Sequence, residues 1–117
     1  MQTNHNIFRA YDIRGIAGTD LTPETIYEIG RAFGTYMQGK SGKKIVCGRD
    51  NRVSGSELQE AYIAGLLASG CDVTNVGFAS SPMIYYASCK YDFDGGTNVT
   101  ASHNPKEYNG CKFVSKN

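Results

Sequence analysis

The stretch KIVCGRDNRVSGSE, residues 44–57, joins a short apolar run to a polar loop and then to the start of a helix. Residues 44–48 are typical of a buried strand, and residues 49–52 are typical of the loop in which such a strand ends. Ser54 and Glu57 have the spacing of a capping box, which predicts that a helix begins there. A strand that leads through a loop into a helix is the unit of a parallel α/β sheet.

The segments on either side continue this alternation. Thr22 followed by Pro23 predicts a helix start, because a threonine side chain caps free N–H groups and proline suits the first turn. Ser81 and Pro82 predict another start of the same kind. The run 110–115 follows the strand before it too closely for a parallel crossover. We therefore predict a three-layer α/β/α fold with a mostly parallel, four-stranded mixed sheet whose last strand is antiparallel. The predicted helices cover residues 23–39, 54–69 and 82–90, and the predicted strands cover 44–48, 72–77, 96–101 and 110–115.

Length and composition bound the function. With 117 residues, the chain suffices for one domain and is too short for two ordinary ones. Twelve basic and eleven acidic residues leave a net charge of +1, so neither a nucleic-acid surface nor a membrane surface is indicated. No apolar run is long enough for a membrane span or a signal sequence, and we expect a cytoplasmic protein. The four cysteines stand far apart and are predicted to be free, buried thiols.

Three polar loops follow the predicted strands and should meet at one edge of the sheet, where open α/β sheets bind ligands. These loops cover residues 49–52, 80–82 and 102–105. In TASHNP, residues 100–105, Pro105 suits the first position of a short helical turn, with Asn104 as its cap and Glu107 completing a capping box. A phosphate near Ser102 would find N–H donors and a favourable dipole there. The alternative is a turn without chemistry, because these residue types are common in turns.

Four segments of the chain resemble the first domain of the α-D-phosphohexomutases and, within that family, the phosphomannomutase/phosphoglucomutase group. The segments are FRAYDIRG (8–15), GRDNRVSG (48–55), SSP (80–82) and GGTNVTASHNPKEYNGCK (95–112). The resemblance implies that Ser102 carries a phosphoryl group, gives it to a hexose phosphate to form a bisphosphate, and takes one back from the other position of the sugar. It also implies Mg²⁺ as a cofactor, with the phosphate on Ser102 as one ligand, and hexose 1,6-bisphosphate as activator and intermediate.

The resemblance assigns roles to residues around this serine. Lys112 matches the lysine that moves a proton on or off the sugar hydroxyl, and nearby cations would favour the neutral amine that this role needs. Arg14 matches an arginine whose donors stabilise charge on the phosphoryl group. His103 either assists by hydrogen bonding or proton transfer, or only orients the loop. Without the resemblance, Lys112 would be an exposed strand lysine and Arg14 the partner of Asp12.

The remaining candidates would bind phosphate or shape the loop. Tyr11 and Asn104 are expected to shape the site. Arg49 and Arg52 either contribute to the electrostatic field and brace the loop, or form a structural ion pair with Asp50.

Members of the resembled family have four domains. We therefore expect residues 1–117 to be domain I alone, without its last helix and without domains II–IV. Such a piece should show little or no turnover of a hexose phosphate, and its uncovered sheet face should favour self-association. The resemblance does not choose among mannose, glucose and glucosamine phosphates. Two alternatives stay open: a phosphoglucosamine mutase domain, and a non-catalytic, flavodoxin-like module that binds phosphate.

Overall fold

Eight helices and strands follow one another in the residues that the computed structural model describes, 12–101 and 105–115. In chain order they are β1 (Asp12–Ile16), α1 (Pro23–Gly39), β2 (Lys44–Arg49), α2 (Gly55–Ala68), β3 (Asp72–Phe78), α3 (Ser81–Lys90), β4 (Gly95–Val99) and β5 (Tyr108–Ser115). The predicted alternation is confirmed from α1 to β5. None of the helices in these residues has the length and apolar character that a membrane span requires.

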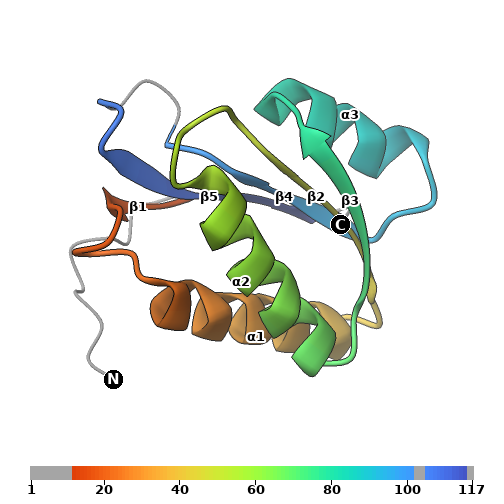
Figure 1. Cartoon of the computed structure of the whole chain (residues 1–117). Coiled ribbons are helices and arrows are strands. Elements are labelled where there is room, and N and C mark those ends of the chain that lie inside the picture. Colours follow the sequence, from red (N-terminus) through yellow and green to blue (C-terminus); the bar gives the residue numbers. More distant parts are fainter. Residues whose placement is uncertain (1–11, 102–104, 116–117) are drawn as a thin grey trace.

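The strands form one sheet in the order β1-β5-β4-β2-β3. Strands β4, β2 and β3 are parallel to one another, β5 runs antiparallel to β4, and β1 runs antiparallel to β5. Helices α1 and α2 cover one face of the sheet and α3 covers the other, which makes three layers (Figure 1). The predicted fold class and the direction of β5 are confirmed. The predicted count of four strands is wrong, because the described residues form five.

Strand β1, at one edge of the sheet, is the element that the sequence does not predict. Its backbone pairs with β5, from Asp12 opposite Lys112 to Ile16 opposite Tyr108. Ile13 packs into the core, whereas Ile16 is 38% exposed. Five residues with one large buried side chain carry too little alternation for a local strand signal. The strand therefore depends on its pairing with β5.

Local capping signals explain the starts of α1 and α3. The Thr22 hydroxyl accepts a hydrogen bond from the N–H of Thr25 at 3.2 Å, and Pro23 opens α1 as predicted. At α3, the capping side chain is that of Ser80, which accepts from the N–H of Met83 at 3.3 Å. Helix α3 therefore begins at Ser81, one residue earlier than predicted.

The predicted capping box at the start of α2 is wrong. Ser54 has helical backbone angles, with φ −77° and ψ −7°, and its side chain caps no helix N–H group. A capping serine needs an extended backbone to aim its oxygen at those groups. Instead, the Ser54 hydroxyl accepts a hydrogen bond from the Asn109 side-chain amide at 2.8 Å. This bond ties the start of α2 to β5.

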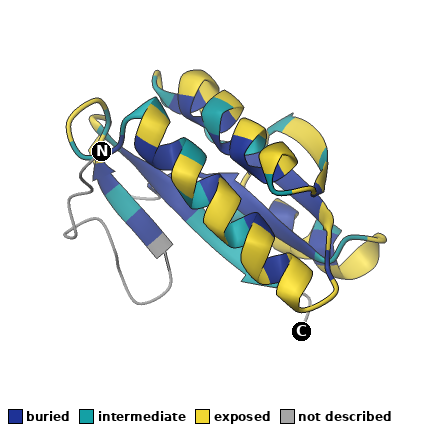
Figure 2. Ribbon diagram, turned by 90° about the horizontal axis from the view of Figure 1, so that it is seen from below, coloured by how far each residue is buried: buried dark blue, intermediate teal, exposed yellow. Residues whose placement is uncertain are grey.

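The hydrophobic core lies between the sheet and the helices α1 and α2. Buried and exposed residues alternate along both helices, as expected for helices with one face on a core (Figure 2). Tyr62 of α2 is fully buried, and its hydroxyl shares a hydrogen bond of 2.6 Å with the Thr97 hydroxyl of β4. Around it lie Ile13, Leu21, Ile26, Met37, Ile45, Leu58, Leu66 and Val99.

Helices α1 and α2 approach each other most closely at two glycines. A Cβ on Gly65 would overlap the Tyr27 carbonyl oxygen and lie 2.9 Å from the Arg31 nitrogen. A Cβ on Gly30 would overlap the Tyr62 carbonyl oxygen. The missing side chains therefore let the two helix backbones touch, which fixes the spacing of this layer.

All four cysteines are free, as predicted. Cys47, Cys71 and Cys111 are buried, but Cys89 is exposed, so the prediction of burial is wrong for one of them. Burial raises the pKa of the Cys47 thiol from 9.0 to about 12 and also raises the pKa of Cys111. These two thiols therefore stay protonated in the folded state at pH values where an unfolded thiol ionises.

The difference in burial predicts how the thiols react. Near pH 8, a thiol-specific dye should label about one thiol quickly in the folded chain, that of Cys89, and all four in denaturant. Fast labelling of a second thiol in the folded chain would contradict the burial.

The raised pKa of the Cys47 thiol predicts how stability depends on pH. Above about pH 9, the unfolded state binds fewer protons than the folded state, so the free energy of unfolding should fall as pH rises towards 12. Denaturant titrations at several pH values measure this fall.

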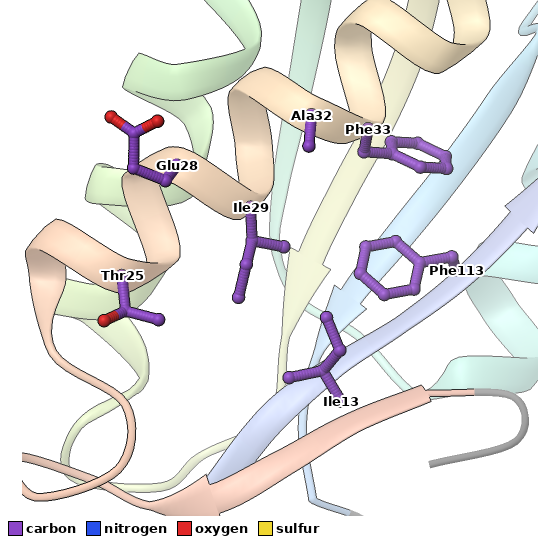
Figure 3. A pocket seen from close by; sticks show the side chains of 7 residues that line it. All are labelled: Ile13, Thr25, Glu28, Ile29, Ala32, Phe33 and Phe113. Atoms are coloured by element: carbon purple, nitrogen blue, oxygen red, sulfur yellow. The ribbon is translucent and has the colours of Figure 1, made fainter. Parts of the chain in front are cut away.

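A hollow of about 410 Å³ lies between α1 and the β1–β5 edge of the sheet (Figure 3). Its lining is mostly apolar and consists of Ile13, Thr25, Glu28, Ile29, Ala32, Phe33 and Phe113. The rings of Phe33 and Phe113 lie 5.0 Å apart, measured between their centroids. Among these lining residues only Glu28 is charged, so the hollow suits apolar contacts rather than an anionic ligand.

Candidate functional site

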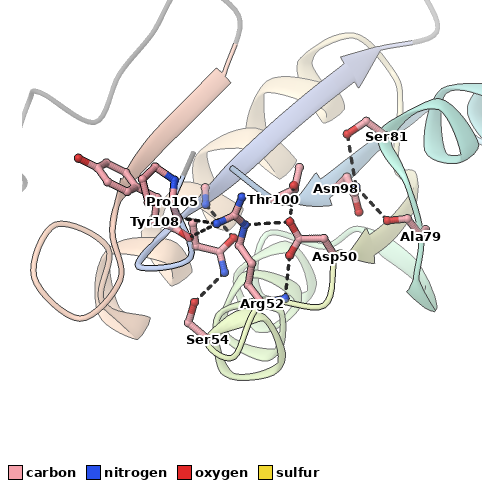
Figure 4. Close-up of polar contacts among 11 residues, drawn as sticks. Asp50, Arg52, Ser54, Ala79, Ser81, Asn98, Thr100, Pro105 and Tyr108 are labelled. Carbon is pink, nitrogen blue, oxygen red and sulfur yellow. Dashed lines mark hydrogen bonds and ion pairs between the residues drawn. The ribbon is translucent and has the colours of Figure 1, made fainter. Parts of the chain in front are cut away.

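The loops that follow β2, β3 and β4 meet at the carboxyl ends of these strands, as predicted (Figure 4). Arg52, in the loop after β2, donates a hydrogen bond to the carbonyl oxygen of Pro105 at 2.7 Å. The side-chain amide of Asn98, in β4, donates to the Ala79 carbonyl oxygen at 3.2 Å and to the Ser81 hydroxyl at 3.4 Å. One edge of the sheet therefore gathers polar groups from three loops.

A carboxylate at this edge joins two of these loops. Asp50 accepts a hydrogen bond from the Thr100 hydroxyl at 2.5 Å. It also accepts from the backbone N–H of Arg52 at 3.1 Å and from the Arg52 Nε at 3.0 Å. The side chains are largely shielded from water, with 25% of Asp50 and 10% of Arg52 exposed. The predicted ion pair is thus present, and it also reaches Thr100, which sequence reasoning does not single out.

The Arg52 guanidinium spans the turn at residues 105–108. Its Nη1 donates to the carbonyl oxygens of Pro105 at 2.7 Å and Tyr108 at 3.1 Å. Within the turn, the N–H of Tyr108 donates to the Pro105 carbonyl oxygen at 2.9 Å. Arg52 therefore does both things that the sequence leaves as alternatives: it pairs with Asp50 and it braces this loop.

Lys112 and Arg14 lie on the same face of the sheet, on the α3 side. Their sequence neighbours Cys111 and Ile13 belong to the core on the α1–α2 side, and successive residues of a strand point to opposite faces. The pairing of β1 with β5 places Arg14 opposite Gly110, two residues from Lys112. Both side chains are half-buried, and no carboxylate within residues 13–101 and 105–115 pairs with Lys112.

Strand β5 places Lys112 next to the carboxyl end of β4. Lys112 pairs with Asn98 across the sheet, and the N–H of Thr100 donates to the Gly110 carbonyl oxygen at 2.8 Å. The chain continues from Thr100 towards Ser102. The pairing therefore places a lysine near the point at which this segment leaves the sheet.

Arg49 lies on the other face of the sheet. Its Nε donates to the Gln59 side-chain oxygen on α2 at 3.2 Å, and its guanidinium lies 4.3 Å from the centroid of the Phe78 ring. Gln59 in turn donates to the Asn75 side chain on β3 at 3.0 Å. The structure thus does not bring Arg49 together with the two cations of β1 and β5. Its contacts join β2 to α2 and β3.

Four predicted site residues lie outside the described residues, and their roles stay predictions. They are Tyr11, Ser102, His103 and Asn104. The described residues that flank the loop are Ala101, which is buried, and Pro105, which is exposed. The predicted cap by Asn104 therefore stays a prediction as well, while the turn that should follow it is present.

The described residues do not by themselves form a magnesium site. They contain no group of three or more His, Cys, Asp or Glu side chains that could hold a metal ion. Asp50, the carboxylate at this edge, is engaged by Thr100 and Arg52. Mg²⁺ requires octahedral oxygen ligands. The Mg²⁺ implied by the resemblance therefore stays a prediction that needs ligands from beyond these residues.

Two further buried polar residues at this edge, Asn98 and Asn109, are not among the predicted site residues. Asn98 and Asn109 are almost fully buried, and each joins its strand to a neighbouring loop through its side-chain amide. The sequence feature that could have identified both asparagines is a polar side chain within an otherwise buried strand, because a buried polar group needs a specific hydrogen-bond partner.

Comparison with known proteins agrees with this geometry. Residues 5–117 match the family model described as phosphoglucomutase/phosphomannomutase, alpha/beta/alpha domain I. The chain is 47% identical over 109 residues to the phosphomannomutase/phosphoglucomutase of Pseudomonas aeruginosa, covering 93% of this chain and 24% of that protein. It is also 47% identical over 106 residues to the phosphoglucosamine mutase of Clostridioides difficile, covering 90% of this chain and 24% of that protein.

A solved structure gives the same result in three dimensions. The crystal structure of a phosphoglucomutase/phosphomannomutase family protein from Burkholderia thailandensis matches with a TM-score of 0.95 and 40% identity. The match covers 98% of this chain and 27% of that one. The chain thus spans about a quarter of the length of the relatives that it matches.

Proposed function

The chain belongs to the phosphoglucomutase/phosphomannomutase family, as its α/β/α domain I, and we propose that it provides the phosphoserine of a hexose phosphate mutase. In the proposed reaction, a phosphoryl group on Ser102 is transferred to a hexose 6-phosphate or a hexose 1-phosphate. The hexose 1,6-bisphosphate so formed returns the phosphoryl group from its other position. The observation that carries the proposal is the family match over residues 5–117, which includes the whole segment around Ser102.

Each half-reaction exchanges one P–O bond for another. The bond between phosphorus and the Ser102 oxygen breaks while a bond forms between phosphorus and a sugar hydroxyl oxygen. The sugar hydroxyl gives its proton to the neutral amine of Lys112, and the serine oxygen takes a proton from protonated His103. Arg14 supplies N–H donors to the phosphoryl oxygens, on which negative charge is spread during transfer. The return step reverses these transfers at the other position of the sugar.

The positions of Arg14 and Lys112 support the roles proposed for them. Both lie on the α3 face of the sheet, and Lys112 lies beside the end of β4. A guanidinium that is already in place, that of Arg14, lowers the cost of bringing a phosphate dianion and a sugar phosphate together. Tyr11 and Asn104 are proposed to shape the site. Mg²⁺ is proposed as the cofactor of the whole enzyme.

The sugar is not assigned by this domain. The chain is 47% identical both to the phosphomannomutase/phosphoglucomutase of P. aeruginosa and to the phosphoglucosamine mutase of C. difficile. Similarity in domain I therefore does not separate mannose, glucose and glucosamine phosphates. We propose the reaction type and leave the sugar to the remainder of the enzyme.

The test uses a grafted enzyme in which residues 5–117 replace the matching quarter of the P. aeruginosa protein. After incubation with glucose 1,6-bisphosphate, intact-mass spectrometry should show one added phosphoryl group, and peptide mapping should place it on Ser102. The P. aeruginosa protein without the graft, treated in the same way, is the control. A graft that takes up no phosphoryl group, or that carries it on another residue, would contradict the proposal.

The same measurement separates the mutase from a phosphate-binding module. A module of that kind would hold phosphate without a covalent bond and would lose it under the denaturing conditions of mass spectrometry. A phosphoserine survives them. The added mass is therefore expected only for the mutase.

A further inference from the structure

A single ion pair holds both ends of the segment 101–104. On one side, the Thr100 hydroxyl donates to Asp50 at 2.5 Å. On the other side, Arg52 donates to the Pro105 carbonyl oxygen at 2.7 Å. Asp50 and Arg52 are joined to each other by a hydrogen bond of 3.0 Å. The residues on either side of the segment are thus connected through two side chains that belong to a different loop (Figure 4).

The hairpin of β4 and β5 does not need this ion pair for its register. Backbone pairing already aligns the strands from Gly95 opposite Ser115 to Val99 opposite Cys111. The bond between the N–H of Thr100 and the strand β5 continues that alignment to the end of β4. Beyond the strands, backbone bonds hold the 105–108 side, through the Tyr108 N–H to Pro105 and the Ala17 N–H to Glu107, and the ion pair links this side to Thr100.

The geometry of the ion pair suits it to fix the separation of these two sides. A guanidinium is planar and rigid, so its donors set direction as well as distance. Arg52 uses Nε for Asp50 and Nη1 for the carbonyl oxygens of Pro105 and Tyr108. Only 10% of its side chain is exposed, so water competes little for these donors.

We infer that Asp50, Arg52 and Thr100 are positioning residues, which set where Ser102 lies relative to Lys112 without contacting the substrate. This inference rests on the proposed function. Displacing a reacting group by about 1 Å can cost on the order of a hundredfold in rate. Loss of the Thr100–Asp50 bond should therefore lower kcat and leave KM almost unchanged, because the groups that bind the sugar phosphate stay in place.

The kinetic test uses the grafted enzyme with substitutions at Thr100. Thr100→Val removes the hydroxyl and keeps the shape of the side chain, and it is expected to lower kcat about tenfold to a hundredfold. The KM for glucose 1-phosphate should change by less than about twofold. Thr100→Ser restores the hydroxyl and should restore most of kcat. Arg52→Lys should lower kcat as well, because an ammonium lacks the fork that reaches Asp50 and the two carbonyl oxygens together.

The matched control is the same substitution three residues earlier, at Thr97 within β4. Thr97→Val also removes a short hydrogen bond, the one of 2.6 Å to the Tyr62 hydroxyl, but on the opposite face of the sheet. It should lower the melting temperature and leave kcat unchanged. If Thr100→Val also lowers only the melting temperature, the Thr100–Asp50 bond is merely structural and the inference is overturned.

A second readout needs no activity and uses the 117-residue chain itself. Thr100→Val should speed amide hydrogen exchange at residue 100 and at Tyr108, whose N–H groups donate to the carbonyl oxygens of Gly110 and Pro105, and should leave exchange in β2 unchanged. Unchanged exchange at those positions would overturn the inference. Mass spectrometry of the unsubstituted graft distinguishes this result from a failure of the proposed function, because the graft would then take up no phosphoryl group.

Discussion

Replacing Ser102 by alanine is expected to lower kcat of the grafted enzyme by at least about a thousandfold. If Ser102 holds the phosphoryl group between the two half-reactions, the alanine variant has no oxygen to carry it. Binding of the sugar phosphate should change little, since the hydroxyl is a small part of the groups that contact the substrate. The measurement is the conversion of glucose 1-phosphate to glucose 6-phosphate, followed with a coupled dehydrogenase.

A serine in another place provides the control. Ser56 is exposed in the first turn of α2, so Ser56→Ala should keep turnover within about twofold of the unsubstituted graft. Turnover in the Ser102→Ala variant above about a tenth of the unsubstituted value would contradict the phosphoserine, because loss of the group that carries the phosphoryl should cause a much larger loss of rate. In that case the cations at this edge would serve binding alone.

Substituting Gly65 by alanine is expected to lower the free energy of unfolding by about 3 kcal/mol or more. The added Cβ would overlap the Tyr27 carbonyl oxygen and lie 2.9 Å from the Arg31 nitrogen, so the backbone of α1 would have to move. A backbone cannot rotate out of the way as a side chain can. Since small domains are stable by only about 5–15 kcal/mol, this loss would be a large fraction of the total. Denaturant titration followed by circular dichroism measures it.

A glycine at the end of α1 tests whether close packing is the cause. A Cβ on Gly39 would meet no atom within 4 Å. Gly39→Ala should therefore be neutral or should slightly stabilise the domain, because alanine loses less backbone entropy on folding. A Gly65→Ala variant as stable as Gly39→Ala would show that the two helices can separate without cost.

The parts of the fold that the sequence predicts are those with local causes. Thr22 and Pro23 specify the start of α1 through a side-chain cap and a fixed backbone angle, and both signals lie within four residues of the groups they act on. The predicted start of α3 at Ser81 and Pro82 is right to within one residue, since the capping side chain is that of Ser80. The direction of β5 follows from the short connection that precedes it, which excludes a parallel crossover.

The parts that the sequence does not predict depend on distant partners. Strand β1 exists because it pairs with β5, near the other end of the chain. Ser54 has the sequence neighbours of a capping residue, yet its hydroxyl bonds to Asn109. In both places a contact between residues far apart in sequence decides the local structure, and no window of neighbouring residues contains that information.

The candidate site divides in the same way. Topology alone predicts that the three loops meet, and a family resemblance selects Lys112 and Arg14, which the structure places on one face. The sequence treats Arg49 and Arg52 alike, although their partners differ: Arg49 contacts Gln59 and the Phe78 ring, whereas Arg52 contacts Asp50 and the turn at 105–108. The link between Thr100 and Asp50 needs the pairing of β2 with β4, which only the assembled sheet provides.

The pairing of β1 with β5 has a consequence for how the domain is made. Strand β1 leaves the ribosome long before its partner, since Asp12 pairs with Lys112. At about 5–20 residues per second, β1 waits on the order of 5 to 20 s while α1, β2, α2 and β3 are already able to assemble. During synthesis the newborn chain therefore carries an unpaired edge next to a growing sheet. A pause in translation before β5 would lengthen that exposure and should increase aggregation, whereas a pause after β5 should not.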